Sequence, residues 1–262
     1  MPYTDTGRIG LFHEISGAGG PPLLLIHELG GSSESWWRFL PLAARTRRTV
    51  AVDLRGAGRS EKPPGSFELA DQADDLAALI GAAFAGPGPM DVIGSALGAL
   101  VAALLAIRHP GAVCRLVLCA VAPEMAGRTA DYVSARAERV RRVGMREVAD
   151  MSLLNAFPSP HEDARAAYRS IYLANDPAAY AEMSLALARL RLTPADWGAI
   201  RQPALVLSGA HDFIWPPDEG RRVTALIPSA RFDVLPNAGH FPHMQTPEDL
   251  HRRAMDFLDH PA

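Results

Sequence analysis

The sequence predicts an α/β fold, with a mostly parallel central sheet flanked by helices and an inserted helical cap. Short apolar runs bounded by turn residues recur along the chain, and amphipathic helical patterns alternate with them. One long interval past the middle of the chain holds helical patterns alone. The alternation favours a parallel sheet covered by helices, and the interval predicts the insertion.

Six apolar runs are predicted to be strands because their apolarity is continuous, which is typical of central parallel strands covered on both faces. They span residues 21–27, 48–54, 90–94, 114–122, 204–210 and 230–236. Amphipathic segments lie between them, such as residues 68–84, and residues 247–260 form a last helix.

No strand pattern appears between Pro123 and Trp197. These roughly seventy residues are too many for an ordinary crossover between two strands. We therefore expect residues 1–122 and 198–262 to form the core, and residues 123–197 to form a helical cap (lid). The cap is expected over the carboxyl ends of the strands, where open α/β folds hold their sites.

Composition excludes several classes of function. The chain has 262 residues and a formal net charge of −3, so its charge gives no reason to expect nucleic acid or a membrane surface as partner. No apolar run is long enough to span a membrane. Lys62 is the only lysine, and with the abundant Ala, Gly and Pro this indicates a GC-rich, bacterial coding sequence.

The two cysteines indicate a reducing compartment. Cys114 and Cys119 lie five positions apart on one predicted strand, so they point to opposite faces and cannot form a disulfide. Free thiols of this kind are typical of the cytoplasm, and the first residues hold no apolar signal core. We expect a cytoplasmic protein with a small-molecule substrate; nothing in the sequence indicates an oligomeric state.

The segment "GSALG", residues 94–98, has the pattern of a nucleophile elbow, a sharp turn between a strand and a helix. Its glycines are needed because side chains there would collide with the neighbouring strand and helix. Two further residues follow in the order of a catalytic triad. Asp212 comes just after a predicted strand, and His240 lies in a loop before the last helix, so the aspartate can orient an imidazole that takes up a proton.

In these segments the sequence resembles the α/β-hydrolase superfamily over essentially the whole chain. "LLLIHELGGSSESW" resembles its oxyanion loop, "DLRGAGRSEKP" its strand-4 turn, "GSALG" its elbow, "GAHDFIWP" its acid loop and "NAGHF" its histidine loop. The resemblance implies a capped enzyme similar to esterases and lactonases. It also implies that the backbone N–H groups of Leu29 and Leu97 form the oxyanion hole, which stabilises the negative oxygen of a reaction intermediate.

Two residues depart from the family pattern. The family usually has serine at the elbow apex and glycine after the oxyanion-loop histidine, where this chain has Ala96 and Glu28. Alanine cannot attack a carbonyl carbon, so no acyl-enzyme forms through residue 96. Ser95 is not expected to substitute, because its side chain leaves the turn in another direction. A carboxylate at position 28 would oppose an oxyanion unless it points away or is protonated.

Three interpretations fit these residues. In the first, Ala96 is an engineered replacement in an ordinary serine hydrolase. In the second, alanine is native, and His240 with Asp212 activates water or moves a proton, as in serine-independent lyases and decarboxylases of the family. In the third, the chain is a non-catalytic binder of a small molecule. The first two are favoured about equally, because a pure binder has no need of both His240 and Asp212.

Some of the remaining polar residues are predicted to be structural, and others are predicted to contact the substrate. His27, Asp53 and Arg55 are expected to stabilise loops, and the arginines of residues 136–142 are expected to form a solvated helix face, although one could reach a substrate carboxylate. Contacts to substrate are weakly predicted for Glu28, Ser95, Trp36, Trp37 and Trp215, with His211 and His243 as rim or packing residues. No metal-ligand spacing, Rossmann fingerprint or P-loop appears, so no metal or cofactor is predicted.

Overall fold

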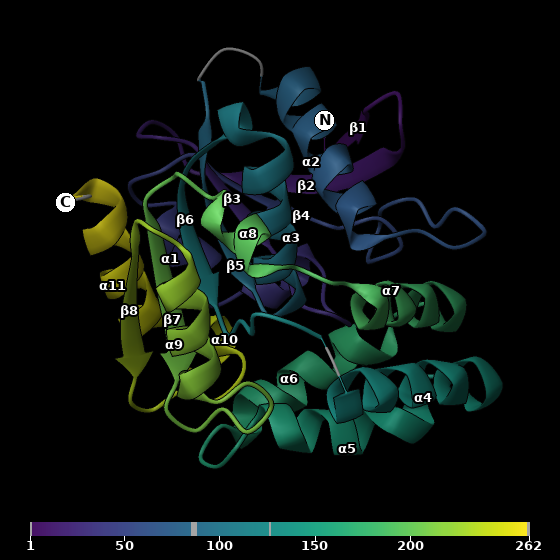
Figure 1. The fold of residues 1–262 in the computed structure, drawn as a ribbon. Coiled ribbons are helices and arrows are strands. Elements are labelled where there is room, and N and C mark those ends of the chain that lie inside the picture. Colours follow the sequence, from purple (N-terminus) through teal and green to yellow (C-terminus); the bar gives the residue numbers. More distant parts are fainter. Residues whose placement is uncertain (1, 85–87, 126, 261–262) are drawn as a thin grey trace.

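The computed structural model describes residues 2–84, 88–125 and 127–260, so positions 1, 85–87 and 261–262 of the predicted core and position 126 of the predicted cap lie outside the described residues. The described residues form one eight-stranded sheet with the order β1-β2-β4-β3-β5-β6-β7-β8 (Figure 1). The strands are β1 Tyr3–Asp5, β2 Gly10–Ser16, β3 Leu23–Ile26, β4 Thr49–Val52, β5 Met90–Ser95, β6 Val113–Cys119, β7 Ala204–Gly209 and β8 Ala230–Leu235.

The predicted α/β fold is confirmed, and each of the six predicted strands is present. β3 to β8 pair in parallel, whereas β1 and β2 form an antiparallel edge in which β2 also pairs antiparallel with β4. The sequence analysis missed β1 and β2. β1 has three exposed or half-buried residues, and β2 mixes apolar residues with His13, Glu14 and Ser16, so neither has the continuous apolar run of a central strand.

Helices cover both faces of the sheet, as the continuous apolarity of the strands requires. In β3, Leu24 and Ile26 pack into one apolar cluster with α2 and α3, whereas Leu23 and Leu25 pack into a second cluster with α1 and α11. Short helices α8 and α10 and helix α9 complete the core. The bounds of these core helices are α1 Leu40–Ala43, α2 Leu69–Ala83, α3 Leu97–Arg108, α8 Pro194–Gly198, α9 Pro217–Leu226, α10 Pro242–Gln245 and α11 Pro247–Asp259, with 3₁₀ turns η1 Ser33–Trp36 and η2 Pro110–Ala112.

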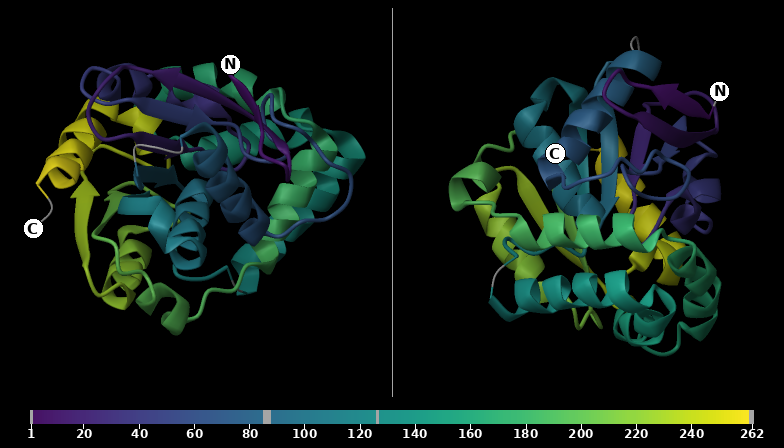
Figure 2. Two further views of the ribbon diagram at one scale, coloured as in Figure 1. Left: turned by 90° about the horizontal axis from the view of Figure 1, so that it is seen from above. Right: turned by 90° about the vertical axis from the view of Figure 1, so that its right-hand side faces the viewer.

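Four consecutive helices follow β6 and lie together at one end of the sheet (Figure 1). They are α4 Gly127–Val143, α5 Arg146–Ala156, α6 Glu162–Leu173 and α7 Pro177–Arg189, and we call them the inserted helices. α7 begins at Pro177, and the Asp176 carboxylate caps its first turn by accepting a hydrogen bond from the Ala179 N–H at 2.8 Å. In the right-hand view of Figure 2, α4 and α7 run side by side across the end of the sheet.

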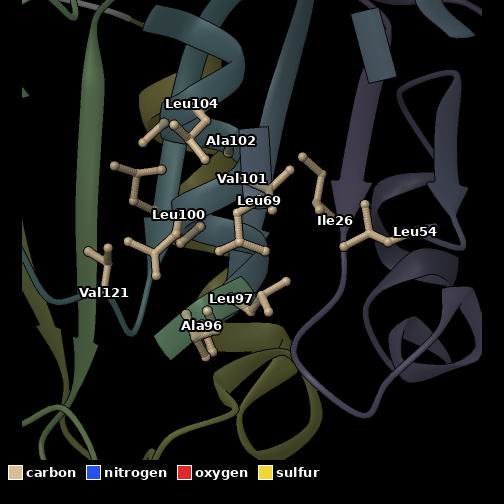
Figure 3. Packing of buried hydrophobic residues seen from close by; sticks show 14 of the residues in the cluster. Ile26, Leu54, Leu69, Ala96, Leu97, Leu100, Val101, Ala102, Leu104 and Val121 are labelled. Atoms are coloured by element: carbon tan, nitrogen blue, oxygen red, sulfur yellow. The ribbon is translucent and has the colours of Figure 1, made fainter. Parts of the chain in front are cut away.

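The turn from β5 into α3 is the sharpest feature of the core. Ala96 has a φ of +52°, a conformation that L-residues rarely adopt, and its N–H donates to the Cys119 carbonyl at 2.9 Å. A Cβ at Gly98 would lie 2.2 Å from the Ile26 carbonyl oxygen, and one at Gly94 would lie 2.3 Å from the Gly98 carbonyl oxygen. Glycine is therefore required on both sides of the turn, as predicted. Figure 3 shows Ala96 and Leu97 at the end of the apolar cluster that α3 contributes.

No helix of the described residues is long and apolar enough to cross a membrane.

Because the contact at Gly98 is with backbone, which cannot move aside as a side chain can, we predict that Gly98→Ala destabilises the protein by about 2 kcal/mol or more. Gly81, in α2, has no atom near its Cβ position, so Gly81→Ala is the matched control and should stabilise the protein by about 0.5–1 kcal/mol. Urea denaturation of both variants measures the two effects. Equal effects of the two changes would contradict the close packing of the turn.

Candidate active site

A cavity of about 130 Å³ lies between the elbow and the inserted helices. The core contributes residues at the carboxyl ends of its strands, and the inserted helices contribute most of the remaining wall. The cavity is lined by Leu29, Ala96, Leu97, Met125, Thr129, Tyr132, Val133, Arg136, Ser152, Leu153, Asn155, Ala156, Tyr168, Tyr172, Tyr180, Leu187, Ile214, Trp215, His240 and Phe241. It lies where the sequence predicted a site.

His240 and Asp212 form a hydrogen-bonded pair at this cavity. The His240 Nδ1–H donates to Asp212 Oδ2 at 2.8 Å, and both side chains are buried. The other carboxylate oxygen of Asp212 accepts from the backbone N–H groups of Ile214 and Trp215 at 2.8 and 2.9 Å. Three donors thus fix the carboxylate, and a proton on Nδ1 leaves Nε2 of His240 as the nitrogen that can accept a proton.

Gln245 holds the histidine loop from both sides of His240. Its Oε1 accepts from the N–H groups of Gly239 and Phe241, each at 3.0 Å, and its Nε2 donates to the Ala156 carbonyl at 3.2 Å. The backbone N–H of His240 donates to the same Ala156 carbonyl at 3.3 Å. The histidine loop is therefore tied to the end of inserted helix α5.

Leu97 and Leu29, for which the resemblance implies an oxyanion hole, both line the cavity. Leu97 is the first residue of α3, so its N–H is one of the helix-terminal donors without a partner in the helix, and both residues line the cavity beside Ala96. The loop that carries Leu29 is held by its neighbours. His27 donates from Nδ1 to the Glu28 carbonyl at 2.7 Å and accepts from the Leu54 N–H on Nε2 at 3.0 Å. Asn175, after α6, donates to the Gly30 carbonyl at 2.8 Å.

Position 96 brings only a methyl group to the cavity, which His240 also lines. Ser95 does not supply the missing hydroxyl. Its side chain is fully buried, its Oγ has no hydrogen-bond partner among the described residues, and it does not line the cavity. The cavity wall thus includes His240, hydrogen-bonded to Asp212, together with Leu29 and Leu97, and the apex of the turn offers only the methyl group of Ala96.

Glu28 points away from the cavity into a buried polar cluster. Its Oε1 accepts from the Ser35 hydroxyl at 2.8 Å, and its Oε2 lies 3.1 Å from His243 Nε2, an ion-pair distance whose angle does not satisfy hydrogen-bond geometry. Burial alone would raise the pKa of Glu28, but the contact with His243 outweighs burial and lowers the pKa to about 2. Burial and the adjacent Glu28 raise the pKa of the Tyr168 hydroxyl. Glu28 is therefore an ionised structural residue.

Several weakly predicted contacts are corrected by these positions. Glu28, Ser95, Trp36 and Trp37 do not line the cavity, whereas Trp215 does. Trp36 is fully buried and packs on the His243 ring with 4.4 Å between centroids, which explains why it cannot reach a substrate.

His27, Asp53 and Arg55, which the sequence analysis expects to stabilise loops, make hydrogen bonds of that kind. The Asp53 carboxylate accepts from the N–H groups of Ser33 and Arg59 at 2.6 and 2.7 Å, which fixes the turn after β4. Arg55 makes a two-pronged pair with Asp75 on α2 at 2.7 and 2.8 Å. His27, as described above, braces the oxyanion loop.

The sequence analysis assigned Arg136 to a solvated helix face, with the alternative that one of these arginines reaches a substrate carboxylate, and the structure places Arg136 at the cavity. Arg136 follows Val133 by three positions and precedes Val140 by four, so it lies on the buried stripe of α4. That spacing is a signal in the sequence. The orientation of the stripe toward the cavity depends on how α4 packs on α7, which no local pattern encodes.

Comparison with known proteins agrees with this geometry. A family model described as alpha/beta hydrolase fold matches residues 21–247. The chain belongs to the α/β-hydrolase family. Among curated relatives of this α/β hydrolase, the pimeloyl-[acyl-carrier protein] methyl ester esterase of Edwardsiella ictaluri is 30% identical, over 95% of this chain and 97% of the relative.

Solved structures of similar proteins superpose closely. The enol-lactonase from Burkholderia xenovorans LB400 has a TM-score of 0.92 and 26% identity, and the match covers 99% of this chain and 100% of that one. A thermophilic esterase from Thermogutta terrifontis has a TM-score of 0.90 and 29% identity, with 96% and 93% covered. These relatives and the family make hydrolase the enzyme class of this α/β hydrolase.

The lowered pKa of Glu28 predicts a pH dependence of stability. Because the folded pKa of about 2 lies below the ordinary value of 4.5, the ionised form stabilises the fold above pH 4.5, and this contribution is lost as the pH falls toward 2. Its size is about 3 kcal/mol. Chemical denaturation at several pH values should show the native protein losing about that much more stability than Glu28→Gln over this range. Glu34→Gln, at an exposed carboxylate of η1, is the control that should follow the native profile; parallel profiles for all three proteins would contradict the assignment.

Proposed function

We propose that the protein acts on the carbonyl carbon of a small ester, lactone or related acid derivative. The observation that carries the proposal is the His240–Asp212 pair, hydrogen-bonded at 2.8 Å, on a cavity that Ala96 and the amide-bearing residues Leu29 and Leu97 also line. Relatives named as an ester hydrolase and an enol-lactonase support this substrate class.

His240 is proposed as the general base and Asp212 as the residue that orients it. In the chain as it stands, Nε2 of His240 takes a proton from water, and the resulting hydroxide forms a bond to the carbonyl carbon. The electron pair of the C=O bond moves to oxygen, where the N–H groups of Leu29 and Leu97 stabilise the negative charge. When the C=O bond re-forms, the bond to the leaving alcohol breaks, and the imidazolium returns the proton to that oxygen.

Water replaces the acyl-enzyme in this proposal because Ala96 lacks a hydroxyl. The structural role of Glu28 supports alanine as a native feature. Glu28, the other departure from the family pattern, is part of a buried cluster with Ser35 and His243. Engineering that removes a nucleophile gives no reason to create such a cluster, so Glu28 is interpreted as native, and this favours a native alanine at position 96. The same reasoning favours a second candidate, a serine-independent lyase or decarboxylase in which His240 moves a proton and the two amides hold an enolate.

We further propose that residues 123–197 serve as a cap that selects the substrate, since α4 to α7 supply most of the cavity wall. A small molecule is the proposed partner. The cytoplasm is the proposed location: both cysteines are free, with Cys114 exposed and Cys119 buried.

The first test restores the hydroxyl. Ala96→Ser should react with p-nitrophenyl acetate in a burst that approaches one equivalent of nitrophenolate per site, because the oxyanion donors and the base already surround the apex. Rapid-quench kinetics and mass spectrometry of the acyl-enzyme measure it. His240→Ala in the same background should slow the burst by at least about a hundredfold. An Ala96→Ser protein that folds and shows no acylation would refute the proposal that this cavity acts on a carbonyl carbon.

The second test uses the chain as it stands. It should hydrolyse p-nitrophenyl acetate slowly and without a burst, and His240→Ala should lower this rate by about 10²-fold or more. His211→Ala is the matched control, because His211 is an exposed histidine of the same loop as Asp212 and does not line the cavity. Unchanged turnover in His240→Ala would refute the water mechanism.

A further inference from the structure

The cavity wall carries a positive charge that no described acidic lining residue balances and that has no role in the proposed reaction. Arg136 of α4 is the one permanently charged residue among the lining residues, and none of the described lining residues is an aspartate or glutamate. A guanidinium stays protonated at every pH at which proteins fold, so this wall of the cavity carries a fixed positive charge.

Arg136 has no ion-pair partner among the described residues, although other arginines of its helix region do. Arg141, on the same helix, pairs with Glu138 and Glu182. The Nε–H of Arg136 is buried and donates to no acceptor within the described part of the chain. Its guanidinium carbon lies 5.6 Å from the Tyr132 ring centroid and 5.9 Å from that of Tyr180, contacts that are weaker than a carboxylate pair.

A second donor faces the same space. Ser152 of α5 lines the cavity, and its hydroxyl is buried without a hydrogen-bond partner among the described residues. An unpaired charge and an unpaired hydroxyl in a largely apolar cavity both cost stability, and such groups are retained where a ligand completes them. The guanidinium and the hydroxyl are both hydrogen-bond donors, so one anionic acceptor would satisfy both of them.

We propose that the cavity binds a substrate that carries a carboxylate in addition to its ester or lactone group, with Arg136 and Ser152 binding the carboxylate. The reacting carbonyl then lies at Ala96, so the inserted helices recognise one end of the substrate and the core acts on the other. This inference rests on the proposed function, since it names the substrate class of that same site. It assigns Arg136 as a specificity-determining residue.

Pairs of probes that differ in one charge test the proposal. Monomethyl esters of succinic, glutaric and adipic acid are carboxylate anions near neutral pH, and the corresponding dimethyl esters are neutral. Calorimetric titration into the protein at low ionic strength should show at least one monomethyl ester binding about tenfold or more tighter than its dimethyl ester, as a charge-assisted contact predicts. Absence of that preference in all three pairs, including no binding at all, would overturn the proposal.

Two variants assign the preference to Arg136. Arg136→Met keeps the length and apolar stem of the side chain and removes the charge, so the preference should vanish. Arg139→Met, at an exposed position of the same helix, is the matched control and should keep it. Thermal unfolding of each variant establishes that it is folded, and the comparison of probes in the unaltered protein stands even if Arg136→Met does not fold. A preference that survives in folded Arg136→Met would reject the assignment.

The two proposals fail separately. The carboxylate preference is a binding measurement on the chain with Ala96, whereas the carbonyl chemistry is measured with neutral p-nitrophenyl acetate in Ala96→Ser. A preference without a burst would leave the anion site in place and remove the proposed reaction. A burst without a preference would keep the reaction and remove the carboxylate from its substrate class.

Discussion

The site depends on the backbone turn between β5 and α3. Ala96 adopts a φ of +52° because the chain must reverse from a strand into a helix within one residue, and the helix can approach the strands only where Gly94 and Gly98 lack side chains. That close approach brings the N-terminus of α3 to the edge of the sheet. Leu97 and Ala96 then both line the cavity. A strained conformation of this kind persists because its surroundings determine it, whichever small residue occupies the apex.

Around that turn, two loops are fixed by buried polar groups. The Asp212 carboxylate binds two amides of its own loop and the His240 imidazole, while Gln245 binds the amides on either side of His240. The oxyanion loop is held differently, through His27 and through the ionised Glu28 with Ser35. Since Glu28 faces this cluster rather than the cavity, its negative charge is compensated locally, and the loop can carry a carboxylate beside Leu29, whose N–H is proposed as an oxyanion donor.

The core could be predicted from the sequence because parallel strands buried on both faces leave continuous apolar runs. The edge strands β1 and β2 leave no such run, and they were missed. Asp212 and His240 could be assigned because each follows a strand, and loops after parallel strands meet at one edge of the sheet. The wall formed by the inserted helices could not be predicted, because the packing of α4 against α7 decides which side of α4 faces the cavity. The position of Arg136 is a consequence of that packing, whereas Trp36 is buried by contacts with Phe39 and His243 of the core.

The carbonyl of Ala156 accepts hydrogen bonds from both the backbone of His240 and the side chain of Gln245, and Asn175 binds the carbonyl of Gly30. The segment of the inserted helices is therefore hydrogen-bonded to the histidine loop and to the loop that carries Leu29, so the helices proposed to select the substrate also help to position the residues proposed to react. In such an arrangement, a change in the helices that alters which substrate binds also alters the position of the residues proposed to react, and with it the rate of turnover. Replacing this segment with that of a relative would therefore change these hydrogen bonds as well as the cavity wall. Evolution toward a new substrate has to keep the few residues that make these hydrogen bonds, while the other residues of the wall can change.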